Sequence, residues 1–343
     1  MDRFPRYVKP LDSSTDLDVV GGKGRSLAVM LRAGLPVPVG FHVTTSAYQR
    51  FVEHNDIART ILDLAKPVVV GARASFETPS TRVMELFERG ELPTDIVDEI
   101  ASAYAMLNGD KVAVRSSANA EDLPTLSFAG QQETYLNVQG HDDLLIAVKN
   151  CWASLWTTRA LSYRHEMDVD QGGVAMAVII QAMVPADVSG ILFTANPATG
   201  EQNQAIVNCS YGLGEAVVGG QVTPDTFVLD KASLKLKETV LGSKERMIVS
   251  QSTQGTYVQQ VPREQRDTSS LSENSLKDLV ALAKEVEQCF VGQPQDIEWA
   301  IYEGEIWLLQ SRPITHLPEP PPKDVTWPVI PGAQLLKLSL IHI

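Results

Sequence analysis

The segment 296–312 constrains the fold more than any other, because its sequence is that of a single antiparallel hairpin. Residues 296–302 (DIEWAIY) and 306–312 (IWLLQSR) each have the length of a strand, and Glu303-Gly304-Glu305 forms a turn between them. Side chains alternate along a strand, so we expect each strand to place every second residue on one face. The two sets on that face are Asp296, Glu298 and Ala300, and Leu308, Gln310 and Arg312.

This polar face of the hairpin has two explanations. It is either a solvated outer face or the wall of a binding site, and the apolar neighbours of Glu298, which are Ile297 and Trp299, favour a partly buried position. A carboxylate and an amide oxygen suit Mg2+, which prefers oxygen ligands, and a guanidinium suits a triphosphate. The hairpin therefore predicts Glu298 and Gln310 as metal ligands and Arg312 as a phosphate contact.

The rest of the chain mixes helical and strand patterns without strict alternation, which favours an α+β fold over a doubly wound sheet. With 343 residues the chain exceeds the size of a single core, so we expect two lobes. The helical patterns cover 26–32, 142–165 and 276–290, and the strand patterns cover 111–115, 174–181 and 191–194. The expected division is an N-terminal lobe at 1–185, a C-terminal lobe at 186–316, and a Pro-rich linker and tail at 317–343.

Composition excludes several classes of protein. The net charge of -13 disfavours a general nucleic-acid or anionic-membrane surface, so any phosphate site depends on a few placed cations. Three cysteines fit neither a disulfide framework nor a zinc site, and no apolar run is long enough for a signal peptide or a membrane span. We therefore expect a soluble, cytoplasmic protein. The histidines lack partner patterns, and we expect surface or helix-end positions for His42, His54, His141 and His165.

Two cations are candidates for phosphate contacts. Lys23 lies in a Gly-rich turn (GGKG, 21–24) directly before a helix, where the backbone and the helix dipole favour anions. Arg115 ends a buried strand, and an unpaired guanidinium there is costly, so it needs an anion. A solvated lysine and a structural salt bridge explain the two residues equally well when each is considered alone.

Further segments supply candidate nucleotide contacts. The loop 127–134 carries Gly130 and the hydroxyl of Thr134, which are suited to a flap over phosphates. A Gly loop at 211–215 ends in Glu215. The strand at 178–184 carries Gln181 and Met183, where backbone groups are able to pair with the edge of an adenine. By themselves the loop is an ordinary turn and the strand ordinary core.

Taken in order, these segments resemble the nucleotide-binding region of the phosphoenolpyruvate synthase, pyruvate phosphate dikinase and rifampin phosphotransferase family. The resemblance covers residues 12–315. The motifs that carry it are GGK at 21–23, VRSSA at 114–118, EDLP at 121–124, FAGQQ at 128–132, SGILFT at 189–194, YGLGE at 211–215, PQDIEW at 294–299 and QSRP at 310–313.

The resemblance implies a two-lobed ATP-grasp fold that clamps Mg-ATP. It implies that Lys23 and Arg115 contact phosphates, with Gly130 and Thr134 nearby, and that Gln181 and the backbone of Met183 lie beside the adenine. Glu215 then resembles a ribose or nucleotide contact. Glu298 and Gln310 resemble the metal-side pair. Arg312 resembles the triphosphate clamp, and the two catalytic cations are Arg115 and Arg312.

In this family ATP gives its β-phosphoryl group to a histidine on a swivelling domain, leaving AMP and phosphate. No segment here resembles that histidine motif, and the tail after the Pro-rich linker is short, so we expect the phosphohistidine and acceptor domains to lie outside this sequence. The segments 151–156 and 193–197 favour the rifampin branch modestly, which leaves rifamycin or a pyruvate-like acceptor open. The alternatives are a noncatalytic ATP-sensing module and an ATP-grasp ligase, for which no acceptor site is apparent.

Overall fold

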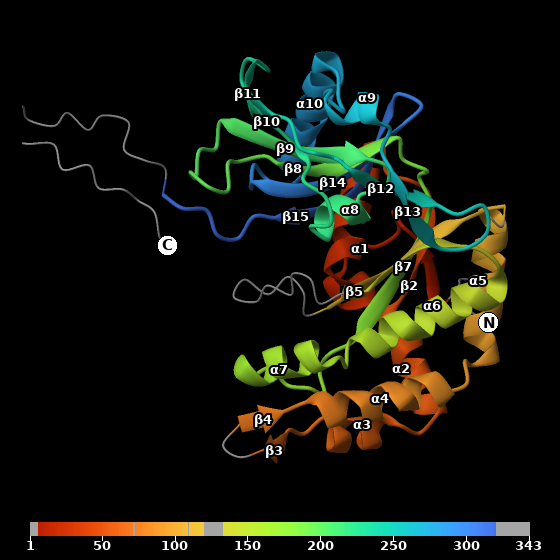
Figure 1. Ribbon diagram of the computed structural model, residues 1–343. Helices are drawn as coiled ribbons and strands as arrows, with labels where there is room; N and C mark the ends of the chain where they lie inside the picture. The colour runs from red at the N-terminus through yellow and green to blue at the C-terminus, as the bar shows by residue number, and fades with distance from the viewer. Residues whose placement is uncertain (1–5, 71–72, 109, 120–132, 320–343) are drawn as a thin grey trace, which may run out of the picture.

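The computed structural model describes residues 6–70, 73–108, 110–119 and 133–319, and it has two antiparallel sheets (Figure 1). All strand pairs in these sheets are antiparallel. The five-stranded sheet has the order β1 (Val8–Pro10), β2 (Gly40–Val43), β7 (Met176–Ala182), β5 (Val112–Ala118) and β6 (Thr134–Val138). The six-stranded sheet has the order β11 (Leu236–Val240), β10 (Asp225–Asp230), β9 (Gln204–Tyr211), β8 (Val188–Phe193), β14 (Gln295–Tyr302) and β15 (Glu305–Pro313). The mixture confirms the α+β class.

Two short ribbons and the helices complete the described fold. The ribbons are β3 (Val68–Val70) with β4 (Arg73–Ser75), and β12 (Arg246–Ser250) with β13 (Thr256–Gln260). The helices are α1 (Leu17–Arg32), α2 (Thr45–His54), α3 (Ala58–Leu64), α4 (Glu77–Arg89), α5 (Thr94–Met106), α6 (His141–Ser154), α7 (Thr158–Glu166), α8 (Glu215–Val218), α9 (Arg263–Arg266) and α10 (Glu273–Cys289). No helix in the described ranges is both long and apolar enough to cross a membrane.

The predicted strand at 174–181 is apolar without alternation because β7 is buried on both faces. Helices α1, α2 and α6 pack against it, and its residues from Met176 to Gln181 are buried, so both faces of the strand need apolar side chains. From Ala182 the chain passes through a short linker into β8 of the other sheet. This passage lies at the predicted boundary between 185 and 186.

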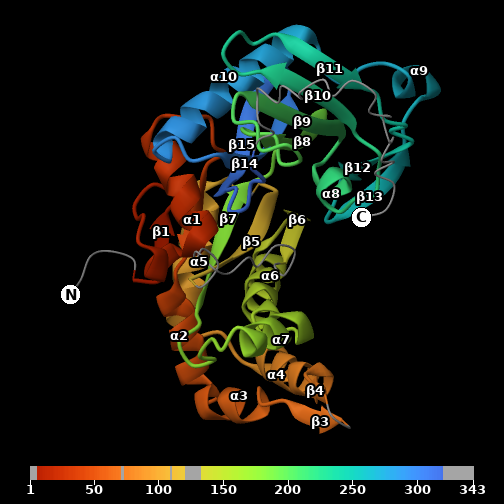
Figure 2. The same ribbon diagram turned by 90° about the vertical axis from the view of Figure 1, so that its left-hand side faces the viewer.

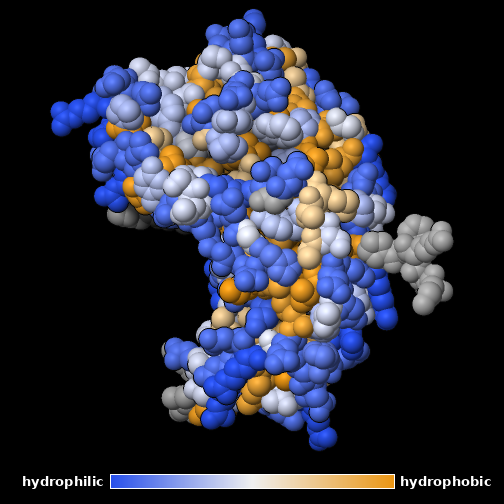
Figure 3. Space-filling model, turned by 90° about the vertical axis from the view of Figure 1, so that its right-hand side faces the viewer, coloured by the Kyte–Doolittle hydropathy of each residue, from blue (hydrophilic) through white to orange (hydrophobic). Residues whose placement is uncertain are grey.

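The second hydrophobic core draws on both ends of the chain. Leu27 and Met30 of α1 pack with Leu279 of α10 and Trp299 of β14. The first core, by contrast, consists of residues from within the range 7–180 of the sequence. Figure 2 shows α1 on one side of the molecule and the β12–β13 ribbon on the opposite side. Figure 3 shows a narrowed waist between the two lobes on a mostly hydrophilic face. The division between 185 and 186 stays a proposal, because α1 belongs to the N-terminal part of the chain but packs against residues that follow the division.

Two predicted helices differ from those observed. Helix α1 begins at Leu17 and includes the Gly-rich segment, with a break at Gly21. The expected helix over 142–165 is two helices, because Thr157 starts a new one: its hydroxyl accepts a hydrogen bond from the amide of Ala160. Trp156, just before this cap, is buried and donates its indole N–H to the hydroxyl of Tyr48 at 3.1 Å.

The surface prediction for His42 is wrong, since this residue is fully buried on β2. Its Nε2 lies 3.0 Å from the Leu11 carbonyl, and its ring approaches α1 at Gly24, where an added Cβ would lie 3.0 Å from His42 Cε1. Burial lowers the pKa of His42 to about 4, against smaller opposing effects from Leu11 and Asp12. Phe41 and Val43, on the opposite face of β2, are also buried, so both faces of this strand are covered.

His42 should make the stability of the fold fall as the pH drops. The unfolded chain binds a proton near the ordinary histidine pKa of about 6.5 and the folded chain only near 4, so this stabilisation is present above about 6.5 and is lost on the way to 4. We expect His42→Gln to remove this slope, which is at most about 1.4 kcal/mol per pH unit. Urea unfolding at pH 7, 6 and 5 measures it.

The matched control is His54→Gln, because His54 is exposed at the end of α2. It should retain the pH dependence of the unaltered chain. If the free energy of unfolding fell with pH equally in His42→Gln and in the unaltered chain, His42 would not be the source of the pH dependence.

Candidate functional site

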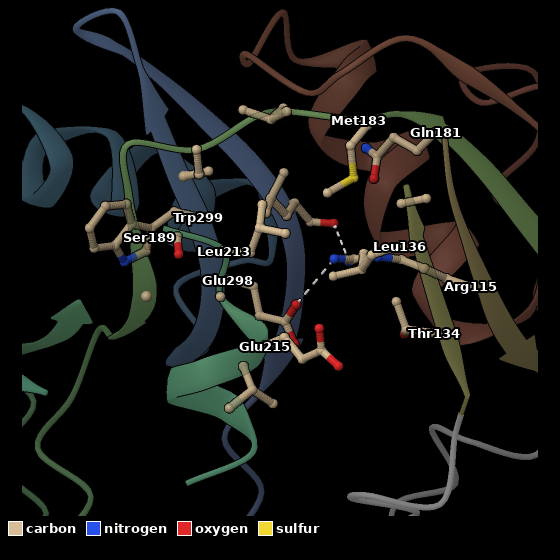
Figure 4. Close-up of a pocket in the computed structure, with 18 of the residues that line it drawn as sticks. Arg115, Thr134, Leu136, Gln181, Met183, Ser189, Leu213, Glu215, Glu298 and Trp299 are labelled. Atoms are coloured by element: carbon tan, nitrogen blue, oxygen red, sulfur yellow. Dashed lines mark hydrogen bonds and ion pairs between the residues drawn. The ribbon is translucent and has the colours of Figure 1, made fainter. Parts of the chain in front are cut away.

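A cavity of about 360 Å³ lies between the two sheets (Figure 4). Its walls come from β5, β6 and β7, from the linker at 183–186, from β8, from the Gly loop before α8, and from β14 and β15. Six of the residues predicted to contact nucleotide line it: Arg115, Thr134, Gln181, Met183, Glu215 and Glu298. The fold thus gathers side chains that are up to 183 positions apart in the sequence, the separation of Arg115 and Glu298.

Arg115 is the charged group that joins the two sheets. Its side chain leaves β5 and extends toward the opposite sheet, where Nη1 donates to the Leu309 carbonyl at 3.0 Å and Nη2 lies 3.5 Å from Glu298 Oε2 (Figure 4). The residue is only 7% exposed, and its Nε has no hydrogen-bond partner in the described part of the chain. A buried, unsatisfied guanidinium donor is costly, and an anion in the cavity would satisfy it.

A β-bulge at Leu309 corrects the predicted face of the hairpin. Arg312 lies opposite Asp296 and Gln310 opposite Glu298, as alternation predicts, but Trp299 lies opposite Leu308, so Leu309 is an extra residue. Leu308 therefore does not share the face of Gln310 and is buried in the second core. The extra residue supplies the carbonyl that Arg115 binds.

The paired register brings the predicted metal ligands side by side. Glu298 and Gln310 are direct neighbours across β14 and β15, so their side chains share one face. Glu298 lines the cavity, whereas Gln310 is buried next to it and is not among the lining residues. A carboxylate and an amide oxygen on directly paired residues fit a hard cation whose other ligands are water and phosphate oxygens. Within the described ranges, no group of three or more His, Cys, Asp or Glu residues forms an alternative metal site.

Arg312 lies two pairs further along the hairpin, on the same face as Gln310 and outside the lining of the cavity. Its Nε and Nη2 both lie 2.8 Å from Asp296 Oδ2, and its side chain is 49% exposed. Burial raises the pKa of Asp296, and the positive charge of Arg312 opposes that shift. Asp296 therefore holds a half-exposed guanidinium at the edge of the hairpin.

The remaining phosphate candidates lie at the other sheet. Lys23 does not line the cavity. Its Nζ donates to the Ser116 carbonyl at 3.2 Å, one residue beyond Arg115 on β5. Thr134 lies directly opposite Arg115 in the register of β5 and β6. Gly130 falls outside the described residues, so its role is an expectation only.

Gln181 and Met183 lie where β7 passes into the linker. The Nε2 of Gln181 donates to the Pro38 carbonyl at 3.4 Å, which orients the buried amide, and Figure 4 shows both side chains at the same end of the cavity. The amide N–H of Met183 donates to the Lys111 carbonyl at 2.9 Å. Any backbone contact from Met183 to a ligand therefore uses its carbonyl.

Glu215 begins α8 on the floor of the cavity. Its carboxylate accepts a hydrogen bond of 3.4 Å from Thr256 of β13, and the amide of Leu213 donates to Ile248 of β12 at 2.8 Å. The β12–β13 ribbon thus supports the Gly loop that carries Glu215.

The tip of this ribbon is fastened to the first sheet by Asn137. Nδ2 of Asn137 donates toward the carbonyls of Gln251 (3.1 Å), Thr253 (3.1 Å) and Gly255 (2.6 Å), and the Asn137 carbonyl accepts from the amide of Gly255 at 3.1 Å. Asn137 is fully buried with a φ of 57°, a left-handed conformation that asparagine tolerates. This contact joins the five-stranded sheet to the β12–β13 ribbon, on the side opposite α1 (Figure 2).

Sequence reasoning missed several residues of the cavity. Leu136, Ser189, Leu213 and Trp299 line it, and Asn137 fastens its outer wall. Leu213 lies inside the recognised Gly loop, but Leu136 and Asn137 belong to a short strand without any chemical motif.

Comparison with known proteins places the chain in a family. Residues 17–328 match the family described as "Pyruvate phosphate dikinase, AMP/ATP-binding domain". The chain belongs to this family. Membership in the pyruvate phosphate dikinase family agrees with the expected two-lobed ATP-grasp-type fold and with the motifs from which the resemblance was inferred.

Three relatives illustrate the extent of the match. A probable phosphoenolpyruvate synthase of Methanothermobacter thermautotrophicus is 39% identical over 326 residues, which cover 93% of this chain and 47% of that protein. One from Archaeoglobus fulgidus is 42% identical, covering 88% and 40%. The rifampicin phosphotransferase of Bacillus subtilis is 38% identical, covering 88% and 35%. The chain spans about half the length of these relatives or less.

Among solved structures, D-alanine-D-alanine ligase from Helicobacter pylori aligns with a TM-score of 0.27 and 12% identity, covering 73% of this chain and 54% of that one. This likeness is too weak to support any statement about the site.

Replacing Asn137 by aspartate should loosen the ribbon. The carboxylate has no donor for the three carbonyls and adds a negative charge facing them, and losing a buried hydrogen bond costs about 1–3 kcal/mol. We expect amide hydrogen exchange in 246–260 to accelerate at least about tenfold, which corresponds to about 1.4 kcal/mol. Hydrogen exchange followed by mass spectrometry measures it.

Asn108→Asp is the control, because Asn108 is exposed and has the same left-handed backbone, with a φ of 58°. Unchanged exchange in the ribbon of Asn137→Asp would show that the contact does not hold the ribbon.

Proposed function

We propose that this chain binds Mg-ATP in the cavity between the sheets and serves as the nucleotide-binding part of a dikinase-type phosphotransferase. The observation that carries the proposal is Arg115, a buried guanidinium whose Nε has no hydrogen-bond partner among the described residues, placed at the wall of a cavity whose other side holds Glu298. The family's description as an AMP/ATP-binding domain supports the same ligand.

The proposed pose follows from the distribution of charge. The adenine lies at the end formed by Gln181 and Met183, where the walls are mainly apolar and the oriented amide supplies a polar contact. The triphosphate then extends toward the cations Lys23, Arg115 and Arg312. Glu215 lies on the floor of the cavity, in place for a contact with the ribose.

Mg2+ would be held by Glu298 and Gln310 and would neutralise phosphate charge there. The other task of this chain's residues is to position the phosphates. Arg115 and Arg312 approach the phosphates from opposite sheets, and the protein environment excludes water from the buried guanidinium. This role requires no general base from the chain.

In the complete enzyme we propose that the β-phosphoryl group passes from ATP to a histidine on a separate swivelling domain. The histidine nitrogen attacks the β-phosphorus, the bond between the α- and β-phosphates breaks, and AMP leaves. Water then cleaves the bond between the β- and γ-phosphates, which releases phosphate and leaves the β-phosphoryl group on the histidine. The histidine then carries the phosphoryl group to an acceptor, which is rifamycin or a pyruvate-like molecule. By itself this chain should bind ATP without completing turnover.

Titration with a nonhydrolysable ATP analogue, with and without Mg2+, tests the binding proposal. At ~100 times its dissociation constant, the ligand should raise the free energy of unfolding by roughly 2.7 kcal/mol. We expect Arg312→Ala to weaken binding at least about tenfold, since a charge-assisted phosphate contact is lost. Thermal unfolding and isothermal calorimetry measure both effects.

Arg59→Ala is the matched control, because that side chain is 97% exposed on α3 and contacts only Asp63 among the described ion pairs. It should bind like the unaltered chain. If the folded, unaltered chain bound no nucleotide, the proposed function would be wrong for this chain on its own.

Glu298→Gln tests the metal site separately. Loss of the carboxylate charge should raise the Mg2+ concentration required for half-maximal analogue binding at least about tenfold, while binding without Mg2+ should not weaken, because a negative charge beside the phosphates is removed. Glu133→Gln makes the same charge change elsewhere on the cavity wall and is the control. An unaltered Mg2+ requirement in Glu298→Gln would exclude this residue as a ligand.

A further inference from the structure

Helix α1 is interrupted two residues before its lysine. Gly21 has a φ of 70° and a ψ of 176°, which are not helical, although the residues on both sides of it are. Such a break needs a cause, and here no proline is present: the sequence around it is VVGGKG.

The cause is a side chain from the neighbouring sheet. The hydroxyl of Ser117 on β5 donates to the Val20 carbonyl at 2.8 Å and accepts from the amide of Gly24 at 3.0 Å. In a continuous helix the amide of Gly24 would donate directly to the carbonyl of Val20, four residues earlier. Ser117 is therefore inserted into the hydrogen-bond ladder of α1. A hydroxyl, which is both donor and acceptor, satisfies both backbone groups.

The packing leaves no other arrangement for the helix. Ser117 is fully buried, and a Cβ added at Gly21 would lie 2.2 Å from the Ser117 backbone oxygen. Only glycine fits this close approach, and only glycine adopts its positive φ without strain. The break and the serine form one unit that fixes α1 against the end of β5.

The break determines where Lys23 points. In the segment that restarts after Gly21, Lys23 Nζ donates to the Ser116 carbonyl at 3.2 Å, which places it one residue from Arg115. Each helical residue adds about 100° of rotation, so closing the break would turn Lys23 away from this position.

We propose that Ser117 is a positioning residue for nucleotide phosphates and acts through Lys23. By splitting α1 it holds the ammonium group beside Arg115, where both cations face the same phosphates. This inference rests on the proposed ATP-binding function and adds to it a residue that does not itself touch the nucleotide.

A double-mutant cycle tests the inference. Ser117→Ala, Lys23→Ala and the double variant are titrated with a nonhydrolysable ATP analogue and with adenosine, in the presence of Mg2+. We expect Ser117→Ala to weaken the analogue about tenfold and adenosine less than about twofold, because only the phosphates meet Lys23. In the Lys23→Ala background, the same serine change should alter analogue binding less than about twofold.

Ser154→Ala is the matched control. Ser154 is also buried, but it lies on α6 and its hydroxyl donates to the Cys151 carbonyl, outside the proposed site. It should bind both ligands like the unaltered chain. If Ser117→Ala does not fold, Ser117→Cys, which keeps the size of the side chain and weakens both hydrogen bonds, should show the same selective loss.

Three results would overturn the inference: equal losses for the analogue and adenosine, a serine effect that persists without Lys23, or no loss in either serine variant. Failure of the proposed function would be distinct, because the unaltered chain would then bind neither ligand. If the unaltered chain and Lys23→Ala bind the analogue equally, nucleotide binding stands and the role of Ser117 through Lys23 is refuted.

Discussion

The contact between Arg115 and the carbonyl of Leu309 governs the arrangement of the site. It joins the middle of the buried strand β5 in one sheet to a bulge in the other, and it places the guanidinium within 3.5 Å of Glu298. In the part of the chain that the structure describes, Nε has no hydrogen-bond partner, so the two sheets approach each other around a charge that is only partly compensated there. The cavity is formed where that compensation is incomplete, which suits an anionic ligand.

Much of this site could be predicted from the sequence because its signals are local. The strand of Arg115, the hairpin of Glu298 and Gln310 and the turn before Glu215 each depend on a few adjacent residues. The structure contains each of these elements, although β5 does not end at Arg115 as predicted but continues to Ala118. The family motifs supplied the order in which to combine them. The alternation of side chains predicted that Glu298 and Gln310 lie on the polar face of the hairpin, and the structure adds that they are direct neighbours in its register.

The parts that escaped prediction depend on contacts between distant segments. The bulge at Leu309 moved Leu308 to the other face, and nothing in the sequence IWLLQSR marks which residue is extra. Ser117 breaks a helix that lies almost a hundred residues earlier, and Asn137 binds carbonyls that a loop supplies more than a hundred residues later. His42 belongs to a short strand that is buried on both faces, and its own face is covered by α1. Such roles require the tertiary fold.

The position of α1 also has a consequence for how the chain is made. The first core is complete with residues up to Ile180, whereas Leu27 and Met30 belong to a core that needs Leu308, and the hydroxyl of Ser26 binds the carbonyl of Ser311, 285 residues away. During synthesis the amino-terminal half therefore leaves the ribosome with one apolar helix face uncovered until the last hairpin emerges. Contacts this far apart in sequence form slowly, so this interval is when the nascent chain is most exposed to aggregation.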